Sequence, residues 1–304
     1  MMMDLIKIGI GVCTRERPYM FKALLKELAK QKIPSGTEVT FIFVENDTDV
    51  SIAKTVDGFK KALIANGTAN PKICVEPEPK LGIPFARNRM LEIALHFDLD
   101  FLAVLDDDEY PADENWLCEM FKGVHTRHLD VAGGIVRVEA VSKADLCSLP
   151  FFSRLIYKHN VSRCIRRQDR KMAFYRKEKD FLLYPRGSNV IYRLLLIRKD
   201  EISFNEKLGF ACGEDREIAF EIKKAGGKSG LIPTAIVCER VRTERLTLRH
   251  VFKARRDHAL VMYGKQYRGI LKSSKSNIPR NLAFTLYIYG SSPPCKPEAD
   301  MGVD

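Results

Sequence analysis

The first 110 residues alternate between two hydrophobic patterns, and this alternation constrains the fold more than any other feature of the chain. Four apolar runs of strand length, rich in β-branched residues, are each followed by a stretch of helical periodicity; the runs are Ile6–Val12, Val39–Val44, Lys72–Val75 and Phe101–Leu105. A repeated strand–helix unit predicts an α/β fold with a Rossmann-like, mostly parallel central sheet and helices on both of its faces. Ligands of such sheets bind at the carboxyl ends of the strands.

Two of the predicted helices can be placed by their apolar residues. After Pro18, which suits a first helical turn, apolar side chains recur at helical spacing, at Phe21, Leu24, Leu25 and Leu28. Another helix begins near Pro84, and the side chains that we expect it to bury are Met90, Leu91, Ala94, Leu95 and Phe97.

The rest of the chain divides by pattern into further segments. Strands are predicted at Val131–Val141 and Ser188–Tyr192, and a helix from about Gly213 to Ala225, which ends at a glycine pair. Residues 142–186 show no clear periodicity and are interpreted as an irregular insert. We therefore expect one domain over 1–240 with halves at 1–110 and 111–240, a basic amphipathic helical extension at 241–275, and a loosely ordered tail at 276–304.

The composition is that of a soluble globular protein. Hydrophobic residues make up 45% and charged residues 29%, and no apolar run reaches the 18 or so residues of a spanning helix. The eight cysteines include no C-x-x-C pair, which favours free thiols in a reducing compartment. Together with a start that lacks a signal-peptide cleavage site, this predicts a cytoplasmic protein, with contact to the inner face of the plasma membrane as an option.

The net charge of +11 lies mainly in the second half of the chain. Basic patches attract nucleic acid, anionic lipid or phosphorylated substrates, so the sign of the charge alone names no partner. No recognised nucleic-acid motif accompanies it, and no nucleic-acid partner is expected. The predicted helix Leu246–Tyr263 has one basic and one apolar side, which suits either an anionic membrane surface or packing on the domain.

Carboxylates gather at two places where the predicted elements end or begin. Asp106–Glu109 directly follow an apolar strand, where a divalent cation would relieve their repulsion and bridge phosphate oxygens; the alternative is a solvated acidic turn. Gly213-Glu214-Asp215 opens a helix, where acids are commonplace because the helix dipole favours them. Asp215 or Glu214 could also accept the proton of an attacking hydroxyl.

Five segments in fixed order resemble the family 2 glycosyltransferases of the GT-A fold, over most of the chain. They are Gly11–Pro18, Val44–Asp47, Gly82–Asn88, Asp106–Glu109 and Gly213–Asp215. Two further segments, Phe204–Gly209 and Glu244–Arg249, resemble bacterial enzymes of exopolysaccharide and lipopolysaccharide assembly, including those of the succinoglycan type. The resemblance implies an inverting, metal-dependent transfer from a nucleotide-sugar to a hydroxyl of a glycan or lipid-linked glycan, with 1–110 as nucleotide-binding half and 111–240 as acceptor half.

The same resemblance implies roles for individual residues. A uridine nucleotide is favoured as the donor's carrier, held by Val12, Thr14, Arg15, Glu45, Asp47, Arg87, Asp106 and Asp107. Mn²⁺ or Mg²⁺ would be bound by Asp106 and Asp108, with Glu239 as third ligand where many relatives have histidine. Asp215 would be the catalytic base, with Glu214 orienting the acceptor, and the sugar and acceptor would lie near Gly187 and Asn189.

Two other functions remain open from the sequence. A sugar nucleotidyltransferase has a similar sheet, and its glycine-rich loop is similar to Gly9–Arg15, although the catalytic lysine soon after the arginine is missing. A non-catalytic binding or membrane-scaffold protein could also use this fold, because a fold alone does not prove activity.

Overall fold

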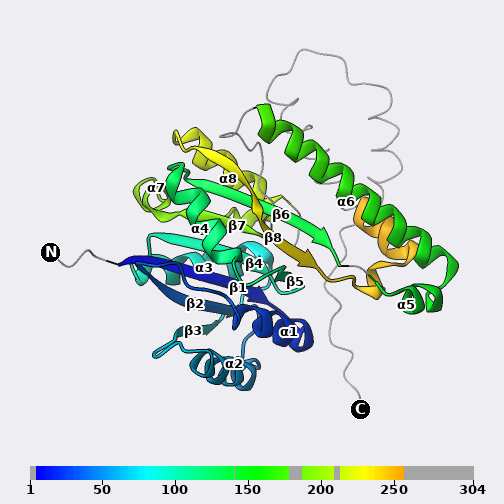
Figure 1. The fold of residues 1–304 in the computed structure, drawn as a ribbon, viewed down its shortest axis with the longest axis horizontal. Coiled ribbons are helices and arrows are strands. Elements are labelled where there is room, and N and C mark those ends of the chain that lie inside the picture. The colour runs from blue at the N-terminus through cyan, green and yellow to red at the C-terminus, as the bar shows by residue number, and fades with distance from the viewer. Residues whose placement is uncertain (1–4, 140, 178–186, 209–212, 257–304) are drawn as a thin grey trace. The chain divides into compact units, whose positions relative to one another are not determined.

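A computed structural model describes residues 5–139, 141–177, 187–208 and 213–256 (Figure 1). These residues belong to one compact unit, Met1–Arg256, whereas the second unit, Asp257–Asp304, lies outside the described residues. The predicted tail at 276–304 and the part of the predicted extension beyond 256 therefore lie outside them too. Within the described part, no helix is long and apolar enough to cross a membrane.

The described strands form a single sheet of eight strands, in the order β3-β2-β1-β4-β7-β6-β8-β5. Their bounds are β1 Ile6–Thr14, β2 Thr37–Glu45, β3 Lys72–Pro77, β4 Phe101–Asp106, β5 Glu109–Pro111, β6 Val131–Val138, β7 Val190–Arg193 and β8 Ser229–Glu239. Strands β3, β2, β1 and β4 are parallel, as predicted. The other half is mixed, because β7 runs antiparallel to β4 and β6, while β6 and β8 are parallel.

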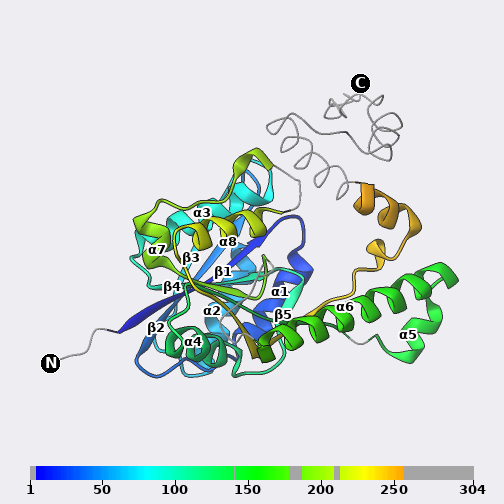
Figure 2. The ribbon, with the colours of Figure 1, turned by 90° about the horizontal axis from the view of Figure 1, so that it is seen from above.

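Helices cover both faces of the sheet, which confirms the predicted layers (Figures 1 and 2). On one face α1 (Pro18–Leu28), α2 (Ala53–Ala65) and α4 (Trp116–Thr126) bury one apolar cluster. On the other, α3 (Ile83–His96), α7 (Leu194–Lys199) and α8 (Glu214–Lys224) bury a second. The four apolar residues predicted for α1 are all buried. In α3 the prediction was wrong for Phe97, which is exposed because the helix ends at His96.

Strand β1 has side chains of different size on its two faces. Ile8, Ile10 and Val12 alternate toward the cluster of α1, because successive strand residues point to opposite faces. A Cβ on Gly11 would lie 2.2 Å from Met90 Sδ, so α3 can pack this closely only against glycine. The glycine pattern thus lies inside a strand rather than in a phosphate-binding loop, which weakens the likeness to a nucleotidyltransferase.

The interpretation of 142–186 as an irregular insert was wrong for its described part. Two helices fill it, α5 (Lys143–Ser148) and the long α6 (Phe151–Lys177). Helix α6 was not predicted because it buries only a narrow stripe of side chains and is polar on most of its circumference. Its sequence therefore shows no wide apolar periodicity. Residues 178–186 lie outside the described residues.

After β8 the chain forms two short helical elements. A 3₁₀ turn, η2, spans Thr243–Arg245, and a helix occupies the described residues 248–256. The predicted helix therefore begins two residues later than expected. Leu246 is buried, whereas Leu248 and Phe252 on the helix are exposed.

Candidate active site

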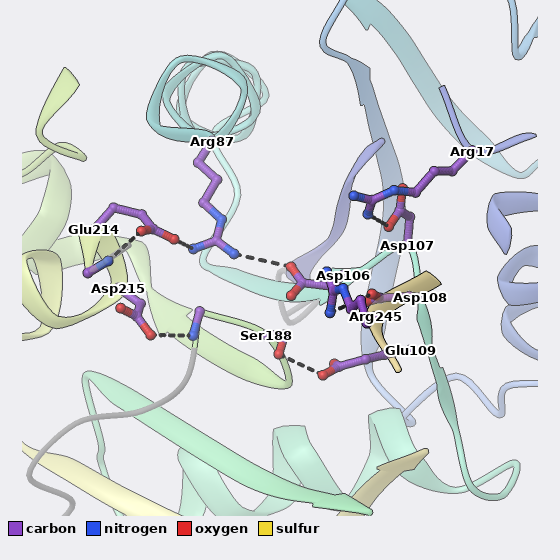
Figure 3. Close-up of polar contacts among 12 residues, drawn as sticks. Arg17, Arg87, Asp106, Asp107, Asp108, Glu109, Ser188, Glu214, Asp215 and Arg245 are labelled. Carbon is purple, nitrogen blue, oxygen red and sulfur yellow. Dashed lines mark hydrogen bonds and ion pairs between the residues drawn. The ribbon is translucent and has the colours of Figure 1, made fainter. Parts of the chain in front are cut away.

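The carboxyl ends of the parallel strands bring three polar side chains to one edge of the sheet. Thr14 ends β1, Glu45 ends β2 and Asp106 ends β4, and the register pairs Thr14 with Glu45 and Cys13 with Asp106. The chain adds β2 and β3 on one side of β1 and β4 on the other, so the strand order reverses at β1. Open α/β sheets bind their ligands at such a point. The acidic segment that follows β4 continues this edge (Figure 3).

Arg87, on α3, joins the acidic segment to the start of α8. Its Nη2 lies 3.1 Å from Asp106 Oδ1 and its Nη1 lies 2.9 Å from Glu214 Oε1 (Figure 3). The Arg87 and Glu214 side chains are both buried, and burial raises the pKa of Glu214 although Arg87 opposes this. A Cβ on Gly187 would lie 2.3 Å from Arg87 Nη1, so the guanidinium passes directly over that glycine.

Asp107 is held by one group at the end of β1 and one in the loop that follows it. Thr14 Oγ1 donates to Asp107 Oδ2 at 2.8 Å, and Arg17 Nη1 donates to Oδ1 at 2.8 Å. Burial still raises the pKa of Asp107, against the effect of Arg17. The β1–α1 loop and the acidic segment are therefore fixed to one another.

Asp108 meets the basic segment that follows β8. Arg242 Nε lies 3.1 Å and Arg245 Nη1 3.7 Å from Asp108 Oδ2. Arg245 Nη1 is also 3.9 Å from Glu239 Oε1. Burial and the neighbouring charge of Asp106 raise the pKa of Asp108 to about 6, against the attraction of Arg245. Arg242 is not aligned for a hydrogen bond, since its Nε and Nη2 lack hydrogen-bond partners among the described residues.

Asp215 stands at the first turn of α8 with its carboxylate oriented by backbone amides. The N–H of Gly187 donates to Asp215 Oδ2 at 3.0 Å, and the N–H of Arg216 donates to Oδ1 at 2.8 Å. Asp215 is half-buried, unlike the buried Glu214 beside it. A carboxylate oxygen has two lone pairs, so each oxygen of Asp215 can accept one more hydrogen bond, from a donor group of an incoming molecule.

Comparisons with known proteins were made by family, by sequence and by structure. No family model matches the chain. The succinoglycan biosynthesis protein ExoM of Rhizobium meliloti (strain 1021) is 26% identical over 257 residues, which cover 83% of this chain and 72% of ExoM. The mannosyltransferase PcManGT of Pyrobaculum calidifontis, solved with GDP-Man and Mn²⁺, has a TM-score of 0.58 at 14% identity, covering 92% of this chain and 68% of that one. The fold is that of a GT-A glycosyltransferase.

Staphylococcus aureus TarS has the same fold. Its fragment 1–349 in complex with UDP-GlcNAc has a TM-score of 0.51 at 17% identity, covering 78% of this chain and 59% of the fragment. The chain spans 37% of the longer TarS structure. At sequence identities this low, the structural likeness shows the fold alone and gives no role to a single residue of this chain.

Several residues predicted to hold the nucleotide have structural partners in this GT-A fold. Both carboxylate oxygens of Glu45 accept from Ser51 and Ile52 just before α2, and Val12 is paired on both sides inside β1. Asp47 is half-buried and accepts from the N–H of Thr48. Arg15 is half-exposed, 3.3 Å from Glu16. Of this group, Asp47 and Arg15 are the more accessible to a nucleotide.

The amide of Asn189 serves the fold. Its Nδ2 donates to the carbonyls of Ile135 and Ala235, and its Oδ1 accepts from Trp116 Nε1 at 2.8 Å. The side chain is buried and its amide is engaged within the fold, and a contact with the acceptor stays a prediction. Gly187 lies beside Asp215, to which its N–H donates, and its place near the acceptor stays a prediction.

Sequence reasoning missed three arginines, Arg17, Arg242 and Arg245, each of which contacts an aspartate of the acidic segment. Arg17 lies in a segment used for the family resemblance, and the other two lie in a stretch already marked as basic. For Arg242 and Arg245 the sequence did hold a signal. The basic segment follows the last strand, β8, and β8 pairs with β5 beside the acidic segment, so opposite charges meet there.

The residues expected to hold a metal ion, Asp106 and Asp108, offer the oxygen ligands that Mg²⁺ and Mn²⁺ take. In the described part of the chain, no three His, Cys, Asp or Glu side chains converge as a metal site, so Glu239 as third ligand stays a prediction. Asp106 is half-exposed and offers carboxylate oxygens. Because Mg²⁺ commonly uses one or two carboxylates together with substrate phosphates and water, Asp106 and Asp108 fit an ion that arrives with a nucleotide.

Proposed function

We propose that this chain is an inverting glycosyltransferase that moves a sugar from a UDP-sugar to an acceptor hydroxyl. The observation that carries the proposal is the Arg87 bridge, because it joins the end of β4 to the start of α8. It brings the carboxylates expected at the donor diphosphate and the expected base into one site. The GT-A fold and the resemblance to ExoM agree with this proposal.

Uracil is the proposed base of the donor, bound near the edge formed by β1 and β2. TarS has been solved with UDP and with UDP-GlcNAc, whereas PcManGT has been solved with GDP-Man, so the fold accepts more than one nucleotide. Asp47 and Arg15 are accessible polar groups there. We assign them to the nucleotide in preference to Glu45, whose oxygens are engaged.

Asp106 and Asp108 would hold Mn²⁺ or Mg²⁺ together with the donor diphosphate. When bound, the ion neutralises negative charge that develops on the departing diphosphate. Arg245 is half-exposed and lies beside both Asp108 and Glu239, so its guanidinium adds positive charge at the same place. This arrangement stabilises the leaving group with groups already in position.

Asp215 is proposed to act as the base in a single displacement. Its carboxylate takes the proton of the acceptor hydroxyl, whose oxygen forms a bond to the anomeric carbon. The bond from that carbon to the diphosphate oxygen breaks, and its electron pair leaves with the diphosphate. The Gly187 N–H holds Asp215 Oδ2 in place, and one displacement inverts the anomeric centre.

The acceptor is proposed to be a glycan or lipid-linked glycan of bacterial surface or extracellular polysaccharide synthesis, reached from the cytoplasm. This rests on the resemblance to ExoM, which covers 83% of the chain. A sugar nucleotidyltransferase is the competing function.

The proposal is tested by calorimetric titration of the full chain with UDP and with GDP, each with and without Mn²⁺. We expect UDP binding that Mn²⁺ strengthens and that Asp108→Asn abolishes, with Asp57→Asn on the exposed face of α2 as the matched control. Thermal unfolding shows whether each variant is folded. Release of UDP from a UDP-sugar supports transfer, whereas formation of pyrophosphate from UTP and a sugar phosphate would establish the nucleotidyltransferase instead.

A further inference from the structure

The long helix α6 has an inner face that is anchored to the sheet. Cys164 Sγ donates to the carbonyl of Val136 on β6 at 3.2 Å, and Gln168 donates to the same carbonyl. Nearer its start, the hydroxyl of Tyr157 accepts from the N–H of Val141 at 3.1 Å. These contacts fix which side of the helix faces outward.

The outward side of α6 is strongly basic. The helix carries nine Lys or Arg residues and one Asp over Phe151–Lys177, a formal charge of +8. Five of the basic residues are exposed on the side opposite Cys164, namely Lys158, Arg163, Arg166, Arg170 and Arg176. A surface of this kind complements a surface that bears many negative charges.

An apolar cluster lies at the beginning of the same helix. Phe151 is 67% exposed, and Phe152 and Leu155 are each 56% exposed. These three side chains therefore lie on the surface and do not belong to the core. The two phenyl rings pack edge to face with centroids 5.5 Å apart, so they form one patch. Figures 1 and 2 both show α5 and the adjoining end of α6 reaching beyond the sheet, which leaves this patch accessible.

We propose that the outer face of α6 docks on an anionic lipid bilayer, with Phe151, Phe152 and Leu155 inserted among the lipids. Charge complementarity selects an anionic partner, and the exposed apolar patch selects one with an apolar interior. Aromatic and leucine side chains beside basic ones suit the boundary between headgroups and acyl chains. A nucleic acid would use the charges but would leave the three apolar side chains in water.

The inner face of the same helix is linked to the sheet edge that carries the candidate active site. Tyr157 contacts the carbonyl of Glu139 at 3.4 Å, and the N–H of Glu139 donates to the carbonyl of Glu239 at 2.9 Å. If the proposed transferase function holds, an acceptor anchored in the bilayer would be presented near Asp108 and Arg245. Vesicle binding itself does not depend on that function, so the two proposals can fail separately.

Vesicle sedimentation with the full chain tests the docking. We expect binding to phosphatidylcholine vesicles that contain phosphatidylglycerol, little binding to phosphatidylcholine alone, and weakening as salt rises. Replacing Arg163, Arg166 and Arg170 with Gln should weaken binding on the order of 100-fold, since each basic residue near the surface contributes roughly fivefold. The matched control replaces Lys54, Lys60 and Lys61, exposed on α2, and should bind like the parent chain.

Insertion of the apolar patch is tested separately by fluorescence. The only tryptophan of the chain, Trp116, is buried, so an added tryptophan can be observed against it. Phe152→Trp should be quenched by brominated acyl chains in anionic vesicles. Tyr19→Trp, at a position 89% exposed on α1, should not be quenched.

The outcomes separate the partners. The proposal is overturned if the chain ignores anionic vesicles, or if the α6 variants bind like the α2 control. It is also overturned if RNA binds and vesicles do not, or if Phe252→Ser abolishes binding while Phe152→Ser leaves it unchanged. Circular dichroism of each variant confirms that a lost interaction is not lost folding.

Discussion

Arg87 and Glu214 form a buried ion pair across 127 residues of sequence, with 2.9 Å between Nη1 and Oε1. The pair connects α3 to the start of α8, and Arg87 continues to Asp106. One side chain thus sets the distance between the two groups of carboxylates on which the proposed reaction depends.

Loss of this arginine should destabilise the fold as well as the site. Arg87→Ala leaves Glu214 buried without its partner, and we expect a loss of about 3–5 kcal/mol in the free energy of unfolding, measured by urea denaturation. Arg87→Lys should rescue only part, because a lysine cannot reach two carboxylates with a planar fork. Arg89→Ala, half-exposed on the same helix, should cost less than about 1 kcal/mol. Equal losses at 87 and 89 would contradict the bridge.

Gly187 should be required only while Arg87 is present. Gly187→Ala puts a Cβ where Arg87 Nη1 lies, and both ends of the guanidinium are held, so the substitution should displace the bridge. In the Arg87→Ala background the same substitution should be nearly harmless. A double-mutant cycle measures this, with an expected coupling of roughly 1–3 kcal/mol. Additive losses would show that Gly187 is needed for another reason.

Asp215→Asn should lower the rate constant of transfer by about 10²–10⁴-fold, because the amide cannot take the acceptor's proton. Donor affinity should stay within about twofold, since Asp215 is assigned to the acceptor side. Glu221→Gln, exposed on the same helix, is the matched control and should keep full activity. Full transfer by the Asp215 variant would remove the base assignment.

Stability should depend on pH through Glu214. Its folded-state pKa is raised by burial, so the folded protein keeps a proton that the unfolded chain, with a pKa of about 4.3, has released. Stability from this group is therefore present below that value and is lost as pH rises through the folded-state pKa. The free energy of unfolding of Glu214→Gln, relative to that of the parent, should therefore increase as pH rises from acidic to neutral. Urea titrations at several pH values measure this difference. A constant difference across this range would argue against a raised pKa.

Asn189 should matter for folding rather than for acceptor binding. Asn189→Ala removes three hydrogen bonds and places alanine at a backbone φ of 49°, in the left-handed region that asparagine tolerates better. We expect a loss of about 3 kcal/mol or more by thermal or urea unfolding. The Michaelis constant for the acceptor, measured on the folded fraction, should not change. An increased acceptor Michaelis constant with unchanged stability would reverse the assignment.

The parallel half of the fold could be predicted from sequence because its strands are short apolar runs between amphipathic helices. Helix α6 could not, since a helix that buries a narrow stripe carries almost no periodic signal. The positions of Asp106 and Asp215 at element ends followed from pattern. The partners of Asp108 did not, because Arg242 and Arg245 reach it only after β8 has returned to β5.

Asn189 shows a different limit of sequence reasoning. From sequence alone, a polar residue beside a predicted strand can equally well bind a ligand or form hydrogen bonds within the fold. The fold contacts of Asn189 appear only once the carbonyls of β6 and β8 are placed around it. The same holds for Glu45, whose oxygens accept from the amides before α2.

The pairing of β5 with β8 also orders events during synthesis. Strand β5 directly follows the acidic segment, yet its partner lies more than a hundred residues later in the chain. A ribosome-bound chain can complete the four parallel strands while the acidic segment still lacks β8 and the arginines behind it. The last part of the domain to leave the ribosome is therefore the part that gives the first-made carboxylates their final contacts.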